Sequence, residues 1–195
     1  QPILEFLRNA GSYRPVRTRK VDFLSLPEVD YSRTRLIDDG WGYDYDRVIA
    51  YVKDPGLFVV FDIFKSRTDE FFTLANLWHT RKIYAQGEHW YDTGYDAVGQ
   101  IALADTDRLL VVFPATHFRI EGVTPQKRHY QDELTIHQAT GRHFEPTHTE
   151  GFITVLVPHA READPQALAA RIRLVEAAPA GAGLGVAIET GTRRI

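Results

Sequence analysis

The sequence predicts an all-β domain: a two-sheet antiparallel β-sandwich with at most one or two short helices. Three observations support this fold class. Apolar residues recur with a period of two, as at Val48, Ala50 and Val52. The periodic segments are rich in Val, Ile, Phe, Tyr and Thr, which suit the pleated surface of a sheet. Turn signals such as "DPG", "ADTD" and "ATGR" separate them at short intervals, a spacing typical of sandwiches and barrels.

The strands are expected in a continuous series along the chain. After the "DPG" turn at 54–56, the almost entirely apolar segment 57–64 is typical of a buried strand. The Ala- and Gly-rich segment 177–185 predicts a hairpin between the last two strands. The predicted strands are 47–54, 57–64, 70–79, 100–105, 108–115, 117–123, 133–139, 151–158, 170–177 and 185–191.

Helical signals are confined to two short segments. Residues 2–9 ("PILEFLRN") place their apolar side chains on one face. In 163–170, Asp164 is suited to an N-cap and Pro165 to the first helical position. Neither segment is long enough to form a helical layer, so two packed sheets remain the expected architecture.

The size and composition favour one soluble globular domain over residues 1–195. Lys and Arg number 23 against 26 Asp and Glu, a formal charge of −3, which argues against a general nucleic-acid binder. No apolar run approaches the roughly 18 residues of a membrane-spanning helix. The absence of cysteine excludes disulfides, thiolate catalysis and cysteine-based zinc sites. The chain begins at Gln1 without a basic and apolar leader, so we expect a mature or excised segment.

One carboxylate stands in an otherwise apolar strand. Asp62 interrupts "LFVVFDIFK", and a buried carboxylate is costly unless a partner satisfies it. If 57–64 and 71–79 are neighbouring strands, His79 can approach Asp62. The pair would then form a structural hydrogen bond or part of a divalent metal site, for example for zinc. Two ligands do not complete such a site, so both interpretations stay open.

Basic and aromatic residues supply candidates for ligand binding. The basic stretch 13–20 is either a solvated edge strand or loop, or a contact to an acidic ligand. The segments 38–47 and 87–96 combine aromatic rings with carboxylates, a pairing that suits sugar rings. The same aromatic residues could instead cover the edge of the core. The candidate substrate-binding residues are Trp41, Tyr43, Trp90, Tyr91, Arg17 and Arg19.

Several catalytic schemes find no motif in this sequence. It has no G-x-S-x-G elbow, no P-loop and no G-x-G-x-x-G motif after a strand. A pair of glycosidase carboxylates stays open, because the distance between two carboxylates in space is not visible in the sequence.

Two segments resemble the C-terminal β-sandwich of heparinase II/III-type polysaccharide lyases. The first is 46–80, in which an Arg opens a strand, a Pro-Gly turn follows, an apolar strand carries Asp62, and the next strand closes on "WH". The second is 144–160, whose "GFITVLVP" is similar to a later strand of that family. The order and spacing of the predicted strands extend the likeness loosely over residues 20–190.

The resemblance implies a domain normally attached to a preceding helical toroid. Such enzymes cleave acidic polysaccharides by β-elimination, with the proton-transferring Tyr and His largely on the toroid. The family's sandwich usually contributes a His-Asn pair, and no "HN" dipeptide occurs here. The isolated chain is therefore expected to support the substrate cleft without being catalytic alone. The likeness also implies a bacterial protein that is periplasmic or secreted, with acidic polysaccharide and the toroid as partners.

The family's metal site, where present, uses His and Asp from the sandwich, and here only Asp62 and His79 fall on family-like positions. No cofactor is otherwise expected. Two further functions stay open: a free-standing carbohydrate-binding module, and a structural domain in which Asp62 is paired internally.

Overall fold

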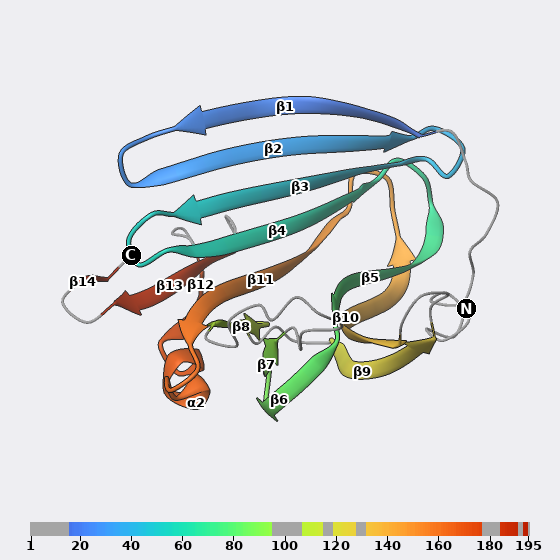
Figure 1. Ribbon diagram of the computed structural model, residues 1–195. Coiled ribbons are helices and arrows are strands. Elements are labelled where there is room, and N and C mark those ends of the chain that lie inside the picture. The colour runs from blue at the N-terminus through green and yellow to red at the C-terminus, as the bar shows by residue number, and fades with distance from the viewer. Residues whose placement is uncertain are drawn as a thin grey trace.

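The fold is all-β, as the sequence predicts, and the residues that the structure describes form three antiparallel sheets (Figure 1). A computed structural model describes residues 16–94, 107–114, 119–127, 132–176, 184–190 and 193–194. An 8-stranded sheet has the order β1-β2-β3-β4-β11-β8-β7-β6, and two 3-stranded sheets have the orders β5-β10-β9 and β12-β13-β14. The elements are β1 (Arg17–Ser25), β2 (Val29–Asp38), β3 (Tyr43–Val52), β4 (Leu57–Ser66), β5 (Glu70–Thr80), β6 (Lys82–Gly87), β7 (Trp90–Gly94), β8 (Asp107–Val112), β9 (Ile120–Lys127), β10 (Asp132–Phe144), β11 (Thr149–Ala160), α2 (Pro165–Ala169), β12 (Ile172–Glu176), β13 (Leu184–Thr190) and β14 (Arg193–Arg194).

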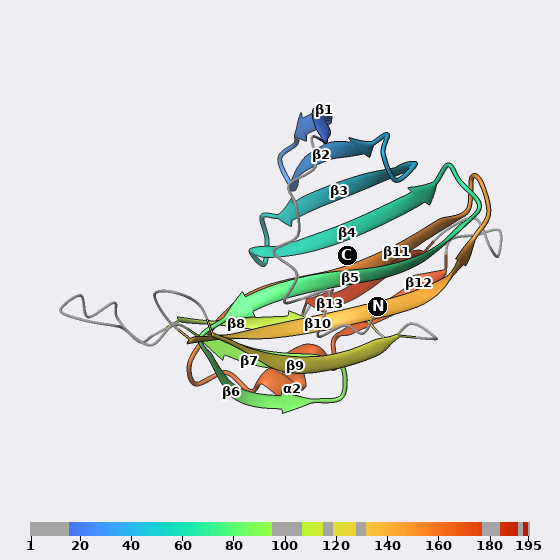
Figure 2. The same cartoon turned by 90° about the vertical axis from the view of Figure 1, so that its right-hand side faces the viewer.

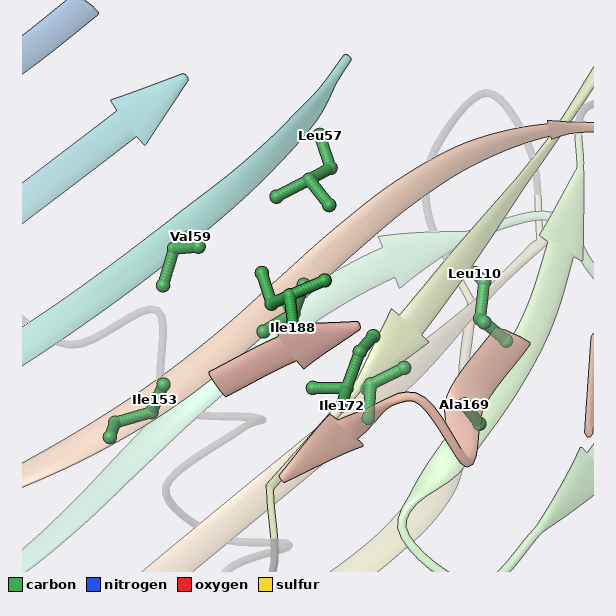
Figure 3. Close-up of a cluster of buried hydrophobic side chains, with 9 residues drawn as sticks. Leu57, Val59, Leu110, Ile153, Ala169, Ile172 and Ile188 are labelled. Carbon is green, nitrogen blue, oxygen red and sulfur yellow. The ribbon is translucent and has the colours of Figure 1, made fainter. Parts of the chain in front are cut away.

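The central strands of the 8-stranded sheet are covered on both faces. Phe64 of β4 packs with Phe72 of β5 and Phe144 of β10, on the side of the β5-β10-β9 sheet. Leu57 and Val59 of the same strand join a cluster with residues of α2, β12 and β13 (Figure 3). A strand with no solvated face needs apolar residues at successive positions, which explains why 57–64 reads as almost continuously apolar.

Strands β1, β2 and β3 extend the large sheet beyond the β5-β10-β9 sheet (Figure 2). All 9 residues of edge strand β1 are exposed. The solvated edge strand predicted in 13–20 is therefore observed from Arg17 onward, and 13–15 lie outside the described residues. Neither β1 nor β2 was expected from periodicity, because polar and charged residues occupy both of their faces.

The expected helix at 163–170 is present as α2. The Asp164 carboxylate accepts a hydrogen bond from the Gln166 backbone N–H at 3.0 Å, and Pro165 follows the cap. Strands β12 and β13 pair antiparallel, as expected for the last hairpin. The predicted helix 2–9 and the predicted strand 100–105 lie outside the described residues. No described helix is long and apolar enough to cross a membrane.

Candidate functional site

Asp62 lies at the centre of β4, with 1% of its surface exposed. Arg47 stands directly opposite it on β3. The Arg47 Nε and Nη2 groups donate to the two carboxylate oxygens of Asp62 at 2.7 and 2.9 Å. The side-chain amide of Asn76 on β5 donates to the same carboxylate from the facing sheet. A bidentate guanidinium and an amide thus satisfy the buried charge that made Asp62 conspicuous in the sequence.

Asn76 is held in turn by polar side chains of both sheets. Its Oδ1 accepts from Trp78 Nε1 at 2.6 Å and from Thr154 Oγ1 on β11 at 3.1 Å. Gln138 of β10 donates to Thr154 Oγ1 at 3.3 Å. We call this set the Asp62 network: Arg47, Asp62, Asn76, Trp78, Gln138 and Thr154. The network links β3, β4 and β11 to β5 and β10 across the sandwich.

The predicted pairing of Asp62 with His79 is wrong. Both Asn76 and His79 belong to β5, but successive side chains of a strand point to opposite faces, and three positions separate the two. Asn76 faces Asp62, so His79 faces away. The His79 Nδ1 lies instead 3.2 Å from the Thr135 hydroxyl and 3.6 Å from a Glu133 carboxylate oxygen. The zinc hypothesis was based on an approach of His79 to Asp62, and the structure does not bring these two side chains together. No group of three or more His, Cys, Asp or Glu suited to a metal occurs in the part of the chain that the structure describes.

Arg47 lies on the same face of the large sheet as Asp62 and reaches solvent beside the facing sheet. It is 40% exposed and borders a groove of about 280 Å³, here called the Arg47 groove. Hydrogen bonds with Asp62 hold the pKa of Arg47 above its ordinary value. Burial, and secondarily the Asp62 carboxylate, raise the pKa of Tyr45, so its hydroxyl stays protonated at neutral pH. The groove is lined by Thr18, Thr34, Arg35, Leu36, Tyr45 and Arg47. Its guanidinium and hydroxyl donors suit an anionic ligand.

A second cluster of arginines lies behind the groove, on the opposite face of β2 and β3. Arg33 Nε and Arg35 Nη2, on β2, each donate at 2.8 Å to one carboxylate oxygen of Asp46. Asp46 is 4% exposed, so two guanidinium groups share one buried carboxylate and leave an excess positive charge. Arg19 of β1 stands directly opposite Arg35 and adds an exposed cation. Like charges placed opposite each other repel, and a bound anion would relieve this repulsion.

The Asp46 carboxyl is expected to make stability depend on pH in acid. Burial by itself would raise its pKa, but hydrogen bonds from Arg35 and Arg33 outweigh burial and hold the pKa below its ordinary value of 3.8. The contribution is therefore complete above about pH 4 and is lost as the pH falls through the folded-state pKa. Asp46→Asn should flatten the loss of unfolding free energy below about pH 4, measured by urea unfolding at a series of pH values. An unchanged acid limb would contradict this assignment.

Arg17 and Trp41 lie at one end of the large sheet. The Arg17 Nη2 donates to Asp39 at 2.7 Å, and Arg67 donates to the same side chain at 3.1 Å. Trp41, in the same β2–β3 turn as Asp39, is 53% exposed. The structure thus brings two of the predicted ligand-binding residues to one turn, where Trp41 is about half exposed.

Two of the predicted substrate-binding aromatics pack in or against the core. The ring of Tyr43 lies 5.2 Å from that of Phe64 and 6.0 Å from that of Phe72, between centroids. Tyr91 is buried, with its ring centroid 5.9 Å from that of Phe113. Both residues occupy the inner face of their strands, so their aromatic rings stabilise the sandwich.

Trp90 lies apart from the residues of the Arg47 groove. It borders a pocket of about 480 Å³, here called the Trp90 pocket, between β7 and β8 on one side and α2 and β12 on the other. The predicted ligand-binding residues therefore divide among the β1–β3 region, the core and the Trp90 pocket.

Sequence reasoning missed Arg33, Arg35, Tyr45 and Arg47 as site residues. A usable signal exists in the spacing: Arg33 and Arg35, like Tyr45 and Arg47, are two positions apart on one strand and therefore share a face. The spacing does not predict which face of the sheet each pair occupies, or which strand lies next to it.

Comparison with known proteins identifies the fold. No family model matches the chain, and no curated protein matches its sequence. A heparan sulfate lyase HepC mutant from Pedobacter heparinus superposes with a TM-score of 0.64 at 11% identity, over 92% of this chain and 27% of that chain. Two heparinase III structures superpose with TM-scores of 0.62 and 0.58 at 11% and 10% identity, each over 91% of this chain. The chain spans about a quarter of the length of these proteins. At this identity the likeness concerns the fold, and the chain has the fold of one part of heparinase III, as the resemblance in the sequence implied.

Proposed function

We propose that this chain is the β-sandwich portion of a heparinase II/III-like polysaccharide lyase and binds acidic polysaccharide at the Arg47 groove. The fold likeness to heparan sulfate lyase supports the class of protein. The observation that carries the ligand assignment is Arg47, held in a fixed orientation by buried Asp62 and exposed in a groove with hydroxyl donors. A parent protein would supply the preceding helical toroid and act outside the cytoplasm.

The hydrogen-bond donors of the groove suit a uronate carboxylate or a sulfate group. An arginine whose orientation is already fixed loses little conformational freedom when it binds such an oxyanion. Arg35 also borders the groove, but its guanidinium donates to Asp46 on the opposite face of the sheet, so a ligand in the groove meets the guanidinium of Arg47. Because the whole chain has a formal charge of −3, the attraction for a polyanion is local to β1–β3.

The groove residues do not supply the base for β-elimination. That reaction needs a group that removes the proton beside the uronate carboxylate. Tyr45 is the titratable hydroxyl in the groove, and its raised pKa keeps it protonated. We therefore infer that the catalytic base comes from another part of the parent protein, and that this domain walls one side of the substrate cleft.

The test is the binding of heparan sulfate to a variant that removes the groove cation without leaving a buried charge. Asp62→Asn combined with Arg47→Gln replaces both ionic partners by amides. Because hydrogen bonds to charged groups contribute about 1.5–3 kcal/mol, affinity should fall by at least about tenfold. Calorimetry at low and moderate salt measures the affinity.

Arg142→Gln is the matched control, because Arg142 is also exposed and ion-paired but belongs to β10, outside the groove. Equal affinity in the double variant and the control would overturn the groove assignment. Absorbance of unsaturated uronate products is followed on the same samples, and no rise is expected. A rise would show that the domain is catalytic alone.

Exposed Trp41 favours a second candidate, a free-standing carbohydrate-binding module. Such a module would bind an unsulfated neutral glycan and lose that binding on Trp41→Ala. Binding confined to acidic glycans would exclude this candidate.

A further inference from the structure

The geometry points to a second saccharide subsite in the Trp90 pocket, one that takes the apolar face of an uncharged sugar ring. This inference is independent of the Arg47 groove, because the two sites lie on opposite faces of the large sheet. Residues paired across neighbouring strands point to the same face of a sheet. Trp90 is paired with Val112, Val112 with Val155, and Val155 with Val59, so Trp90 shares the face of Val59. Val59 and Asp62 are three positions apart on β4 and therefore face opposite ways.

Gly87 sets the position of the Trp90 ring. The two residues stand directly opposite each other in the β6–β7 hairpin. A Cβ atom at Gly87 would lie 2.4 Å from the Trp90 Nε1 and 2.5 Å from its Cε2, closer than real Cβ atoms approach other atoms. The indole therefore lies across the glycine backbone, where any larger residue would displace it. A ring supported in this way loses little freedom when a ligand stacks on it.

The pocket combines an apolar floor with a mixed polar rim. Ala169 and Ile172 of the floor belong to the buried cluster that anchors α2 and β12 (Figure 3). The cap that Asp164 provides fixes the first turn of α2, and with it Gln166 at the rim. The pocket is lined by Glu88, His89, Trp90, Val112, Phe113, Pro114, Gln166, Ala169, Ala170, Ile172, Arg173 and Leu174. Flat apolar surface with a few convergent donors and acceptors is the composition of small-ligand sites.

The charges at the rim select an uncharged ligand. Arg173 donates to Glu189 at 2.8 Å, so its charge is already balanced. Glu88 adds a negative charge on the opposite side of the pocket. An acidic sugar would meet no excess of positive charge here, whereas hydroxyl groups can pair with Gln166, Arg173 and Glu88, and the C–H face of the ring can rest on Trp90.

The test uses the indole N–H signals of the protein, which has three tryptophans: Trp41, Trp78 and Trp90. Uniformly ¹⁵N-labelled protein is titrated with cellopentaose, xylopentaose and mannopentaose, and the signals are assigned with single Trp→Phe variants. A saturable shift of the Trp90 signal with at least one sugar is expected, with the other two signals unmoved. The shift should persist in molar salt, because the sugar carries no charge.

Ala170→Tyr fills the exposed side of the pocket and leaves the core unchanged, because Ala170 is exposed. It should weaken sugar binding by at least about tenfold, the size of effect found when a central aromatic contact is lost. Trp41→Leu is the matched control and should leave this binding unchanged. The inference is overturned if no sugar shifts the Trp90 signal, if Trp41 shifts instead, or if Ala170→Tyr binds as the wild type does.

The two binding sites fail independently in these experiments. Loss of the Arg47 cation should remove salt-sensitive binding of heparan sulfate and leave the neutral sugars bound at Trp90. Ala170→Tyr should have the converse effect. Neutral-sugar binding that is lost in Asp62→Asn/Arg47→Gln, while that protein remains folded, would show that the pocket is not a separate site.

Discussion

Replacing Asp62 by alanine is expected to lower the free energy of unfolding by about 3 kcal/mol or more, since removal of one partner from a buried ion pair typically costs 3–5 kcal/mol. The Asp62 carboxylate is nearly fully buried and accepts from Arg47 and Asn76. Without it, the Asn76 amide loses its acceptor inside the sandwich, and Arg47 loses its counter-charge. Because Arg47 is partly exposed, water can solvate its guanidinium, which places the expected cost at the lower end of that range.

Urea unfolding followed by tryptophan fluorescence measures this change. Asp22→Ala is the matched control: Asp22 is an exposed carboxylate of β1 that accepts from the neighbouring Phe23 N–H. Its replacement should change stability by less than about 0.5 kcal/mol. An equally small effect in Asp62→Ala would show that the Asp62 network does not hold the two sheets together.

Stability should partly return when both charges are removed together. Asp62→Leu combined with Arg47→Met replaces the pair by apolar side chains, and such replacements of buried ion pairs are often neutral or stabilising. The double variant should therefore be more stable than Asp62→Ala, although the amide of Asn76 stays without its acceptor. Lower stability than Asp62→Ala would mean that Arg47 stabilises the sandwich without Asp62.

Replacing Asp92 by alanine should have a second large effect, also about 3–5 kcal/mol. Asp92 of β7 is fully buried. It accepts from Arg108 of β8 at 2.9 Å and lies 3.1 Å from the His159 Nε2 of β11. The Arg108 guanidinium also lies 3.8 Å from the centroid of the Tyr84 ring. Removal of the carboxylate leaves the mostly buried guanidinium of Arg108 without its counter-charge. It also removes the side chain that links β7 to β8 and β11.

Thermal unfolding measures the effect of Asp92→Ala, with Asp132→Ala, an exposed carboxylate at the start of β10, as the control. The midpoint of Asp92→Ala should fall well below that of the control. Heparan sulfate affinity of the folded fraction should stay unchanged, because Asp92 is not in the Arg47 groove. An unchanged midpoint would mean that Arg108 and His159 find other partners in the variant.

Local sequence patterns were sufficient to predict the elements that are stabilised by residues close in sequence. The cap of α2 by Asp164 and the antiparallel pairing of β12 with β13 follow from residues close in sequence. The apolar run 57–64 correctly predicted a buried strand, although the third sheet that covers its second face was not expected. Strand β2 was missed as an element because polar residues on both of its faces leave no hydrophobic period.

By itself, the sequence determined that this protein is an antiparallel β fold, that a carboxylate is buried in one of its central strands, and that part of the chain resembles a heparinase-type sandwich. Only the tertiary structure decided what that carboxylate contacts. Its partners follow from the register that sets Arg47 opposite Asp62 and from the face that β5 turns inward, which selects Asn76 and excludes His79. Both depend on the register of the β3–β4 hairpin and on how β5 packs against the large sheet, and because side chains alternate along a strand, a shift of one residue would exchange every partner.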